Sequence, residues 1–347
     1  MIVNGAEAVK LALAEVLKKD ERSLTFGLGI NDPGRVFGTT TGLVEEFGES
    51  RVFETPTSEA AMTGVGVGLA ISGRRVVHSH QRMDFALLAM DQIVNSAAKW
   101  RYMFGDTFTV PYLTRMIIGR GWGQGPTHSQ NFESWLAHVP GLRVIVPATV
   151  QDLYDGITAL LTTDEPIVFI EHRWLHVAKG ELQFDKSQTR HLAPNYYPSE
   201  RAPDLTIATW GLATFDCLAA KGRLESEFGL NAEIVQIREL SQSSVDEVVR
   251  ASQKTDRLLV AANSWGPASF ASHVLACSLS AADSGKMKGK ALTHPFSPEA
   301  TTLRQLNEFH VSDWRVVNAC LELVGHEKRV RSEPPVDQPK GFNFGPF

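Results

Sequence analysis

The sequence of 347 residues contains only three cysteines, Cys217, Cys277 and Cys320, and they lie far apart. Neither a CxxC pair nor a cysteine–histidine spacing typical of a metal site surrounds them. We therefore interpret them as free thiols of a reducing compartment and expect a cytoplasmic location. Positive charge is also scarce, because 39 acidic residues outnumber 34 basic ones. The resulting net charge of −5 argues against nucleic acid as a partner.

Long hydrophobic runs are missing as well. The longest glycine- and valine-rich apolar run, residues 64–71, is too short to span a bilayer. At the N-terminus, Asn4 and Glu7 have the spacing of a capping box, which predicts an amphipathic helix and not a signal peptide. We therefore expect neither a membrane nor nucleic acid among the partners.

Short β-rich runs alternate with helical ones along the first half of the chain. Buried-type apolar runs predict strands at residues 23–29, 75–78, 111–118, 142–147 and 166–170. Hydrophobic periodicity predicts helices at residues 59–72, 85–102 and 150–161. This alternation indicates an α/β fold with a doubly wound parallel sheet that is covered by helices on both faces.

A polar stretch with three prolines, residues 181–203, is interpreted as a linker to a second α/β set. That set has predicted strands at 205–209, 232–236 and 257–262 and predicted helices at 214–228, 243–254, 268–279 and 312–324. The sequence thus predicts two doubly wound domains, residues 1–180 and 204–328. The tail, residues 329–347, contains prolines and three phenylalanines, and is either a flexible end or a segment that docks on a partner.

Glu59 is the first candidate for chemistry. A glutamate in the first turn of a helix, here after the capping residue Ser58, is favoured by the helix dipole whether or not it has a function. However, the strand that ends near Phe53 would place Glu59 at the carboxyl edge of a sheet, where ligands of α/β folds bind. The glycines and alanines that follow permit close helix packing. Such packing would desolvate the carboxylate and allow proton exchange near neutral pH.

An aromatic ring and several histidines add further candidates. Phe85, at the start of a predicted helix, is either a core residue or a flat face for a heteroaromatic ring. His128 follows the glycine-rich loop 119–125, which lacks the Gly-Lys-Ser/Thr of a phosphate loop. This histidine is either a solvated surface group or a site residue. His78 and His80 share one face of a strand, and without an apparent third ligand they fit a polar pocket wall better than a metal pair.

Several strings of residues together resemble the beta subunit of two-subunit thiamine-diphosphate 2-oxoacid dehydrogenases of the pyruvate, branched-chain and acetoin types. They are Thr-Pro-Thr-Ser-Glu-Ala at 55–60, Asp-Gln-Ile-Val-Asn-Ser-Ala-Ala-Lys at 91–99, and residues 127–130, 137–142 and 166–171. The similarity covers about residues 9–279. It implies a transketolase-like pyrimidine-binding domain followed by a transketolase C-terminal domain.

The resemblance also implies roles for individual residues. Glu59 would hydrogen-bond a ring nitrogen of the cofactor's aminopyrimidine, Phe85 would stack on that ring, and His128 would lie near the substrate. The family's alpha subunit carries a Gly-Asp-Gly motif that holds Mg²⁺ and the diphosphate, and this chain has no such motif. The resemblance therefore implies half of a cofactor site, no metal ligand in this chain, and an alpha partner in an α2β2 assembly.

Two departures from the family pattern bear on the substrate. Leu28 stands where the family carries an acidic residue near the cofactor, and His80 and Arg82 make the stretch before Phe85 more polar and cationic. Either His80 or Arg82 could bind a carboxylate, a phosphate or a sugar hydroxyl.

Three functions are consistent with these departures. The first is decarboxylation of a 2-oxo acid with transfer of the acyl unit, as to a lipoyl acyltransferase. The second is a split transketolase or carboligase that transfers a two-carbon unit to an aldehyde or ketone, for example of a sugar. The third is a non-catalytic assembly subunit. Because a scaffold needs neither the acid, the aromatic ring nor the loop histidine, we expect an enzyme, and the first function above all.

Overall fold

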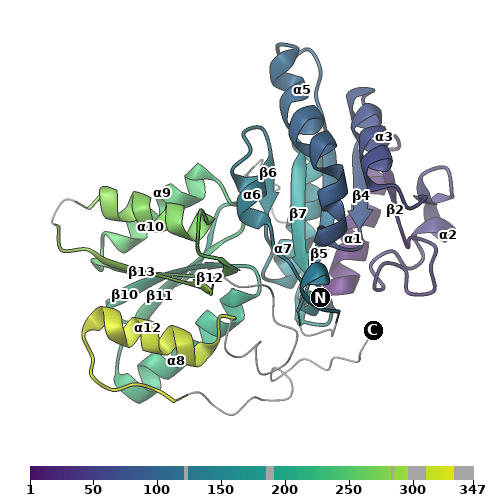
Figure 1. The fold of residues 1–347 in the computed structure, drawn as a ribbon. Helices are drawn as coiled ribbons and strands as arrows, with labels where there is room; N and C mark the ends of the chain where they lie inside the picture. Colours follow the sequence, from purple (N-terminus) through teal and green to yellow (C-terminus); the bar gives the residue numbers. More distant parts are fainter. Residues whose placement is uncertain (121–123, 185–190, 283–284, 296–309, 332–347) are drawn as a thin grey trace. The chain divides into compact units, whose positions relative to one another are not determined.

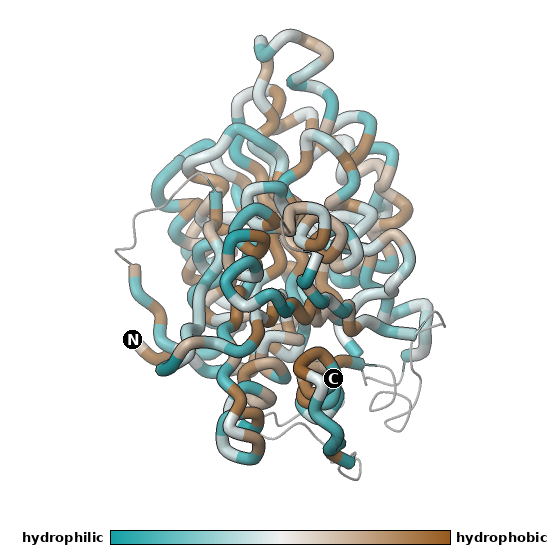
Figure 2. Tube along the Cα trace, turned by 90° about the vertical axis from the view of Figure 1, so that its left-hand side faces the viewer, coloured by the Kyte–Doolittle hydropathy of each residue, from teal (hydrophilic) through white to brown (hydrophobic). Residues whose placement is uncertain are grey.

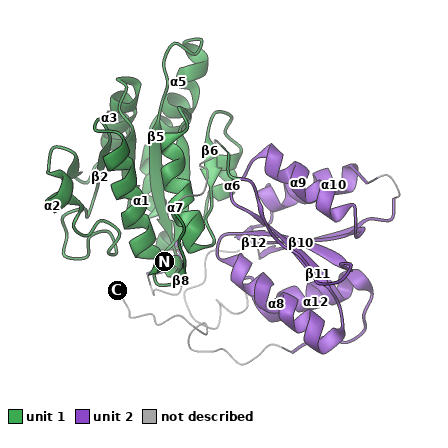
Figure 3. Cartoon of the chain, turned by 180° about the vertical axis from the view of Figure 1, so that it is seen from behind, with its two compact units in different colours: residues 1–119, 127–192, 341–345 green, residues 120–126, 193–340, 346–347 purple. Residues whose placement is uncertain are grey.

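The computed structural model describes residues 1–120, 124–184, 191–282, 285–295 and 310–331. Residues 1–119 and 127–192 form one compact unit, and the described residues within 120–126 and 193–331 form the other (Figure 3). Each unit has its own sheet with helices on both faces (Figure 1), so the predicted α/β class is confirmed. The tail from residue 332, residues 121–123 of the glycine-rich loop and residues 185–190 of the predicted linker lie outside the described residues.

The first unit contains a six-stranded sheet in the order β3-β2-β4-β5-β7-β6. All neighbouring strands pair in parallel. The strands are β2 (Leu24–Gly27), β3 (Val52–Glu54), β4 (Val76–His80), β5 (Tyr112–Ile118), β6 (Arg143–Ile145) and β7 (Ile167–His172). Since most of their residues are buried, the strands are the apolar runs expected of a sheet covered on both faces. A separate antiparallel pair joins β1 (Ile2–Asn4) to β8 (Lys179–Glu181).

Two groups of helices pack on this sheet. One contains α1 (Gly5–Lys19) and α7 (Val150–Thr158), which pack on each other, and the other contains α3 (Glu59–Ile71) and the helical segment that follows β4 (Figure 1). Asn4 caps α1 by accepting a hydrogen bond of 2.9 Å from the Glu7 backbone N–H, so the predicted cap is confirmed. The shorter elements are α2 (Leu43–Phe47), η3 (Pro126–His128), α6 (Glu133–Ala137), η4 (Ala159–Leu161) and η5 (Arg173–His176).

The single helix predicted at residues 85–102 is, in the structure, a series of helical segments of different geometry. It consists of α4 (Met83–Ala86), η1 (Leu87–Ala89), a π-helical segment η2 (Gln92–Ala97) and α5 (Ala98–Met103). It begins at Met83, so Phe85 lies within the first turn and not at the first residue. A hydrophobic pattern with a period of 3.6 residues cannot reveal a π-helical turn, which takes up one additional residue.

The second unit contains the sheet β13-β12-β10-β11-β9, in which only β9 is antiparallel to its neighbour. Its strands are β9 (Asn195–Tyr197), β10 (Leu205–Trp210), β11 (Ala232–Ile237), β12 (Arg257–Trp265) and β13 (Lys288–His294). β9 falls within the predicted linker, and three residues at a sheet edge are too few to produce a sequence signal. Helices α8 (Ala213–Phe228) and α12 (Asp313–Val324) contact each other, as do α9 (Gln242–Ser252) and α10 (Phe270–Ser280) (Figure 1).

Hydrophobic residues recur at intervals along the helices and do not form long continuous stretches (Figure 2). Among the described residues, no helix is both long enough and apolar enough to cross a membrane.

Candidate active site

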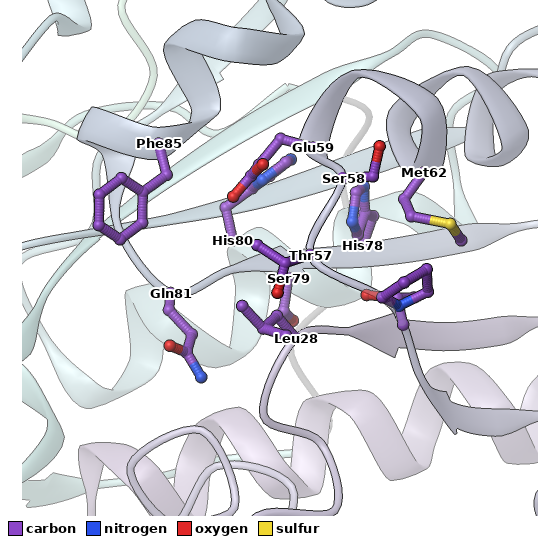
Figure 4. Close-up of a pocket in the computed structure, with 12 residues that line it drawn as sticks. Leu28, Thr57, Ser58, Glu59, Met62, His78, Ser79, His80, Gln81 and Phe85 are labelled. Atoms are coloured by element: carbon purple, nitrogen blue, oxygen red, sulfur yellow. The ribbon is translucent and has the colours of Figure 1, made fainter.

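A pocket opens at the carboxyl edge of the first sheet, where ligands of parallel α/β sheets usually bind. Its walls come from the ends of β2, β3 and β4 and from the first turns of α3 and α4 (Figure 4). In this view Phe85 lies to one side of Glu59 and Met62 to the other. The lining residues are Leu28, Thr55, Pro56, Thr57, Ser58, Glu59, Met62, His78, Ser79, His80, Gln81 and Phe85.

The position of Leu28 is fixed by the backbone around it. A Cβ on Gly27 would lie 2.4 Å from the carbonyl oxygen of Ser79 on the neighbouring strand, so only glycine allows β2 and β4 to pair this closely. The carboxylate of Glu54 then accepts hydrogen bonds from the backbone N–H groups of Gly29 (2.6 Å) and Asn31 (2.8 Å). These two bonds tie the loop after β2 to the end of β3, and this places Leu28 in the pocket wall.

Glu59 is the first residue of α3, and its side chain is half-buried in the pocket. Within the described residues, its carboxylate has no hydrogen-bond or ion-pair partner. Ser58 occupies the N-cap position as predicted, although its side chain makes no capping hydrogen bond. The close helix packing expected from the glycines is found on one face of α3 only. A Cβ on Gly66 would lie 2.6 Å from the Tyr112 ring, whereas Gly68 faces open space.

Buried polar side chains form a network beneath this acid. The hydroxyl of Tyr112 lies 2.8 Å from Nδ1 of His78, and Nε2 of His80 lies 3.4 Å from the Thr63 hydroxyl. The rings of His78 and His80 are 4.3 Å apart, as expected for neighbours on one strand face.

Burial determines the charge of the two histidines. It lowers the pKa of His80 to about 4. Burial, with a smaller effect of His80, also holds the pKa of His78 well below its usual range. Both imidazoles are therefore neutral at physiological pH. The wall of the pocket is polar but uncharged at this point.

Two predicted site residues lie beside the pocket and not in its wall. The ring of His128 packs edge-on against Phe85 with 5.4 Å between the ring centres, and its Nδ1 lies 3.0 Å from the Thr127 hydroxyl. Arg82 is buried, and its guanidinium lies 5.3 Å from the centre of the Phe37 ring. The structure thus brings four of the predicted residues together in one pocket: Leu28, Glu59, His80 and Phe85.

The part of the chain that the structure describes contains no group of three or more histidine, cysteine, aspartate or glutamate side chains that could hold a metal ion. The pair formed by His78 and His80 has no third ligand within this part. The arrangement suits an uncharged, largely flat ligand with hydrogen-bonding edges, because an acid, an aromatic ring and neutral imidazoles surround it.

Comparison with known proteins identifies the family. Residues 3–176 match the family model described as transketolase, pyrimidine binding domain, and residues 197–316 match that of the transketolase C-terminal domain. The 2-oxoisovalerate dehydrogenase subunit beta of Bacillus subtilis (strain 168) is 32% identical over 278 residues, which cover 79% of this chain and 84% of that protein. The chain belongs to the family of 2-oxoacid dehydrogenase beta subunits.

Another member of this family and a solved structure support the same conclusion. The pyruvate dehydrogenase E1 component subunit beta of the same organism is 32% identical over 270 residues, covering 78% of this chain and 82% of that protein. A solved chain described as "Split gene transketolase, inactive beta4 tetramer" superposes with a TM-score of 0.73 at 19% identity. That match covers 94% of this chain and 100% of the other, and shows a shared fold.

Sequence reasoning missed three polar residues of the site in this family member: Glu54, Thr63 and Tyr112. Glu54 had a detectable signal, since an acid at the end of a strand can accept from the N–H groups of a neighbouring glycine-containing turn. The sequence signal for Tyr112 and Thr63 is weaker, because each is only a polar residue within an otherwise apolar element. Neither signal reveals which partner each side chain finds.

Because the imidazole of His80 is neutral in the folded chain, the free energy of unfolding should depend on pH. Above pH 6.5 His80 is neutral in both folded and unfolded chains, so it contributes no pH dependence. As the pH falls from 6.5 to about 4, the unfolded chain binds a proton that the folded chain excludes, so stability decreases. The loss reaches roughly 3 kcal/mol at the low end of this range.

Urea unfolding of the purified chain at several pH values between 4 and 7 measures this effect. His80→Phe should make the acid decline shallower without abolishing it, because burial also lowers the pKa of His78, and the matched control His191→Asn, at an exposed position, should leave the decline unchanged. An equally steep acid decline in His80→Phe would contradict the assignment.

Proposed function

We propose that this chain is the beta subunit of a thiamine-diphosphate-dependent enzyme that decarboxylates a 2-oxo acid and passes on the acyl unit. The names of its relatives support this function, since they are beta subunits of 2-oxoisovalerate and pyruvate dehydrogenases. One observation carries the proposal: Glu59 and Phe85 line one pocket in a domain that matches a pyrimidine-binding family model.

The residues of the pocket fit an aminopyrimidine ring. Phe85 is 36% exposed and offers a face for stacking, while Leu28 and Met62 provide apolar walls. Glu59 is the only acid among the lining residues. When bound, the cofactor supplies an electron sink for breaking a bond next to a carbonyl group.

The chain's own residues would bind the ring and handle its proton. Glu59 would hold a proton against a ring nitrogen, because its carboxylate is half-buried and has no partner among the described residues. Phe85 would orient the ring by stacking and would exclude water from that face. His80 and His128 would face the substrate, the first from the pocket wall and the second from beside Phe85.

The second half of the site would come from another subunit. A diphosphate needs a metal ion or a cradle of backbone N–H groups. The sequence has no Gly-Asp-Gly motif, and the described residues contain no cluster of metal ligands. We therefore infer an alpha partner that holds Mg²⁺ and the diphosphate, most simply in an α2β2 assembly that is active only as a whole. The free thiols of Cys217, Cys277 and Cys320 suit a cytoplasmic enzyme.

A second candidate, the carboligase that transfers a two-carbon unit to an aldehyde or ketone, has one observation in its favour. The wall formed by Ser79, His80 and Gln81 is polar and suits an acceptor with hydroxyl groups. The acceptor distinguishes the two functions: a lipoyl domain would receive the acyl unit in the dehydrogenase, and a sugar aldehyde would receive it in the carboligase.

Substitution of the acid tests the shared chemistry. In the assembly co-purified with the alpha partner, Glu59→Gln should lower the turnover of 2-oxo acids by on the order of 100-fold or more, because the amide cannot exchange the proton. Turnover is measured with a panel of 2-oxo acids and an artificial electron acceptor, which needs neither a lipoyl domain nor an aldehyde.

The matched control is Glu49→Gln, at an exposed position outside the pocket, which should retain full activity. Gel filtration establishes that both assemblies remain intact. Wild-type turnover by an intact Glu59→Gln assembly would remove the proposed role.

Removal of the aromatic face tests cofactor binding separately. Phe85→Ala should weaken thiamine diphosphate binding to the assembly by roughly 1–3 kcal/mol, which is the usual contribution of a base stacked on an aromatic ring. Titration calorimetry measures the affinity. Phe215→Ala, a phenylalanine of the second unit that is also 36% exposed, provides the control, and equal affinities in the two variants would exclude stacking on Phe85.

A further inference from the structure

A cluster of one aromatic and two basic side chains lies at the same carboxyl edge of the first sheet, outside the pocket wall. Phe37 follows β2, Arg82 follows β4 and Arg173 follows β7. The guanidinium of Arg173 lies 4.6 Å from the centre of the Phe37 ring and that of Arg82 lies 5.3 Å from it. The loop after β2 and the ends of β4 and β7 therefore bring two cations onto one aromatic ring.

No direct bond to an acid of the described residues sets the position of Arg173, although burial lowers its pKa and the charge of Glu171 acts on it to raise that pKa in part. Its side chain is half-buried, and it makes no hydrogen bond or ion pair within the described residues. The nearby acid Glu171 is fully buried and already engaged, since it accepts a hydrogen bond from Arg115 and lies 3.5 Å from His176. Burial raises the pKa of Glu171, but Arg115 and His176 outweigh it and the net shift is downward. Glu171 is therefore a charged group whose direct contacts are with Arg115 and His176, while its charge also offsets part of the charge of Arg173.

The two arginines are also electrostatically unfavourable neighbours. Burial lowers the pKa of both, and the charge of Arg173 lowers that of Arg82 further. Asp84 offsets part of the charge of Arg82, but its carboxylate accepts hydrogen bonds from the backbone and side chain of Gln130. The two guanidinium groups therefore repel each other beside Phe37, and an anion bound between them would relieve this repulsion.

Stacking leaves Arg173 able to bind such an anion beside Arg82, whose Nη1 donates a hydrogen bond of 2.9 Å to the Gln81 carbonyl oxygen. A guanidinium that lies over an aromatic ring keeps its N–H donors in its own plane, where they can form paired hydrogen bonds with an oxyanion. The backbone that presents Phe37 is itself unusual. Arg35, Val36 and Phe37 have φ angles of 44°, 47° and 60°, which non-glycine residues rarely adopt and which is exceptional for a β-branched valine. Strain of this kind is concentrated at ligand sites.

We propose that Arg173 and Arg82, held on Phe37, form a binding site for an oxyanion, namely a carboxylate or phosphate group of the substrate. Arg82 directly follows Gln81, which lines the cofactor pocket, so an anion here lies next to the reacting region. The identification of the anion as part of the substrate rests on the proposed function, whereas the site itself does not. The substrate class is then a donor or acceptor that carries an additional negative charge.

Anion binding to the purified full-length chain tests the site without cofactor or partner. Inorganic phosphate and malonate are titrated separately at constant ionic strength, with chloride as the balancing ion, and affinity is measured by calorimetry. Arg173→Gln should weaken binding of the preferred anion roughly tenfold or more, as expected for the loss of charged hydrogen bonds. Preference for phosphate or for malonate identifies the source of the oxyanion.

Two further variants keep the result decisive. Arg74→Gln removes an exposed arginine just before β4 whose side chain makes no hydrogen bond or ion pair among the described residues, and this variant should bind the anion as the wild type does. Arg173→Lys keeps the charge without the planar fork and should bind with intermediate affinity. Equal affinities in the wild type, Arg173→Gln and Arg74→Gln, or no binding by the wild type, would overturn the proposal.

The same variants in the active assembly test the assignment to the substrate. Arg173→Gln should raise KM for a 2-oxo acid with a second carboxylate roughly tenfold, with little change in kcat or in KM for pyruvate. Equal KM effects on both substrates would contradict the assignment. Because cofactor binding does not depend on Arg173 in this account, a failed anion site would leave the roles of Glu59 and Phe85 intact.

Discussion

The close parallel pairing of β2 with β3 and β4 is the constraint on which the rest of the site depends. It brings the ends of three strands to one edge, and it is possible only because Gly27 has no side chain to collide with the Ser79 carbonyl. Glu54 then fixes the loop after β2 through two backbone hydrogen bonds. Leu28, Glu59 and the end of β4 line one pocket as a result. A slip of one residue in this register would turn alternate side chains away from the site.

Charge is distributed unevenly along this edge of the sheet. In the pocket, Glu59 faces neutral imidazoles, so no fixed cation competes with a ligand for its carboxylate. Around Phe37 the situation is reversed, because two arginines lie against one ring and repel each other. The pocket at Glu59 suits an uncharged heteroaromatic ring, whereas the surroundings of Phe37 suit an oxyanion. The two environments together therefore suit a ring-bearing cofactor and a charged substrate at adjacent positions.

The sequence predicts the α/β class and most helices for physical reasons, and four of the predicted site residues line the pocket, while Arg82 and His128 lie beside it. Buried parallel strands appear as apolar runs, and a short motif places Glu59 directly after a strand end. Contacts between residues that are distant in the sequence could not be predicted, because a single sequence does not show which side chains come together. The bonds of Glu54 to the β2 loop and of Tyr112 to His78 depend on strand register, which periodicity leaves open. The convergence of Arg173 and Arg82 on Phe37 depends on a left-handed turn at three non-glycine residues, which no residue preference favours.

The position of one carboxylate relative to the cofactor is the most direct test of this account. A crystal structure of the chain with its alpha partner, Mg²⁺ and thiamine diphosphate measures it. We expect a Glu59 carboxylate oxygen to lie about 2.6–3.2 Å from a pyrimidine ring nitrogen, within hydrogen-bond reach. A Glu59 side chain that points away from the ring, or a cofactor bound elsewhere in the assembly, would contradict it.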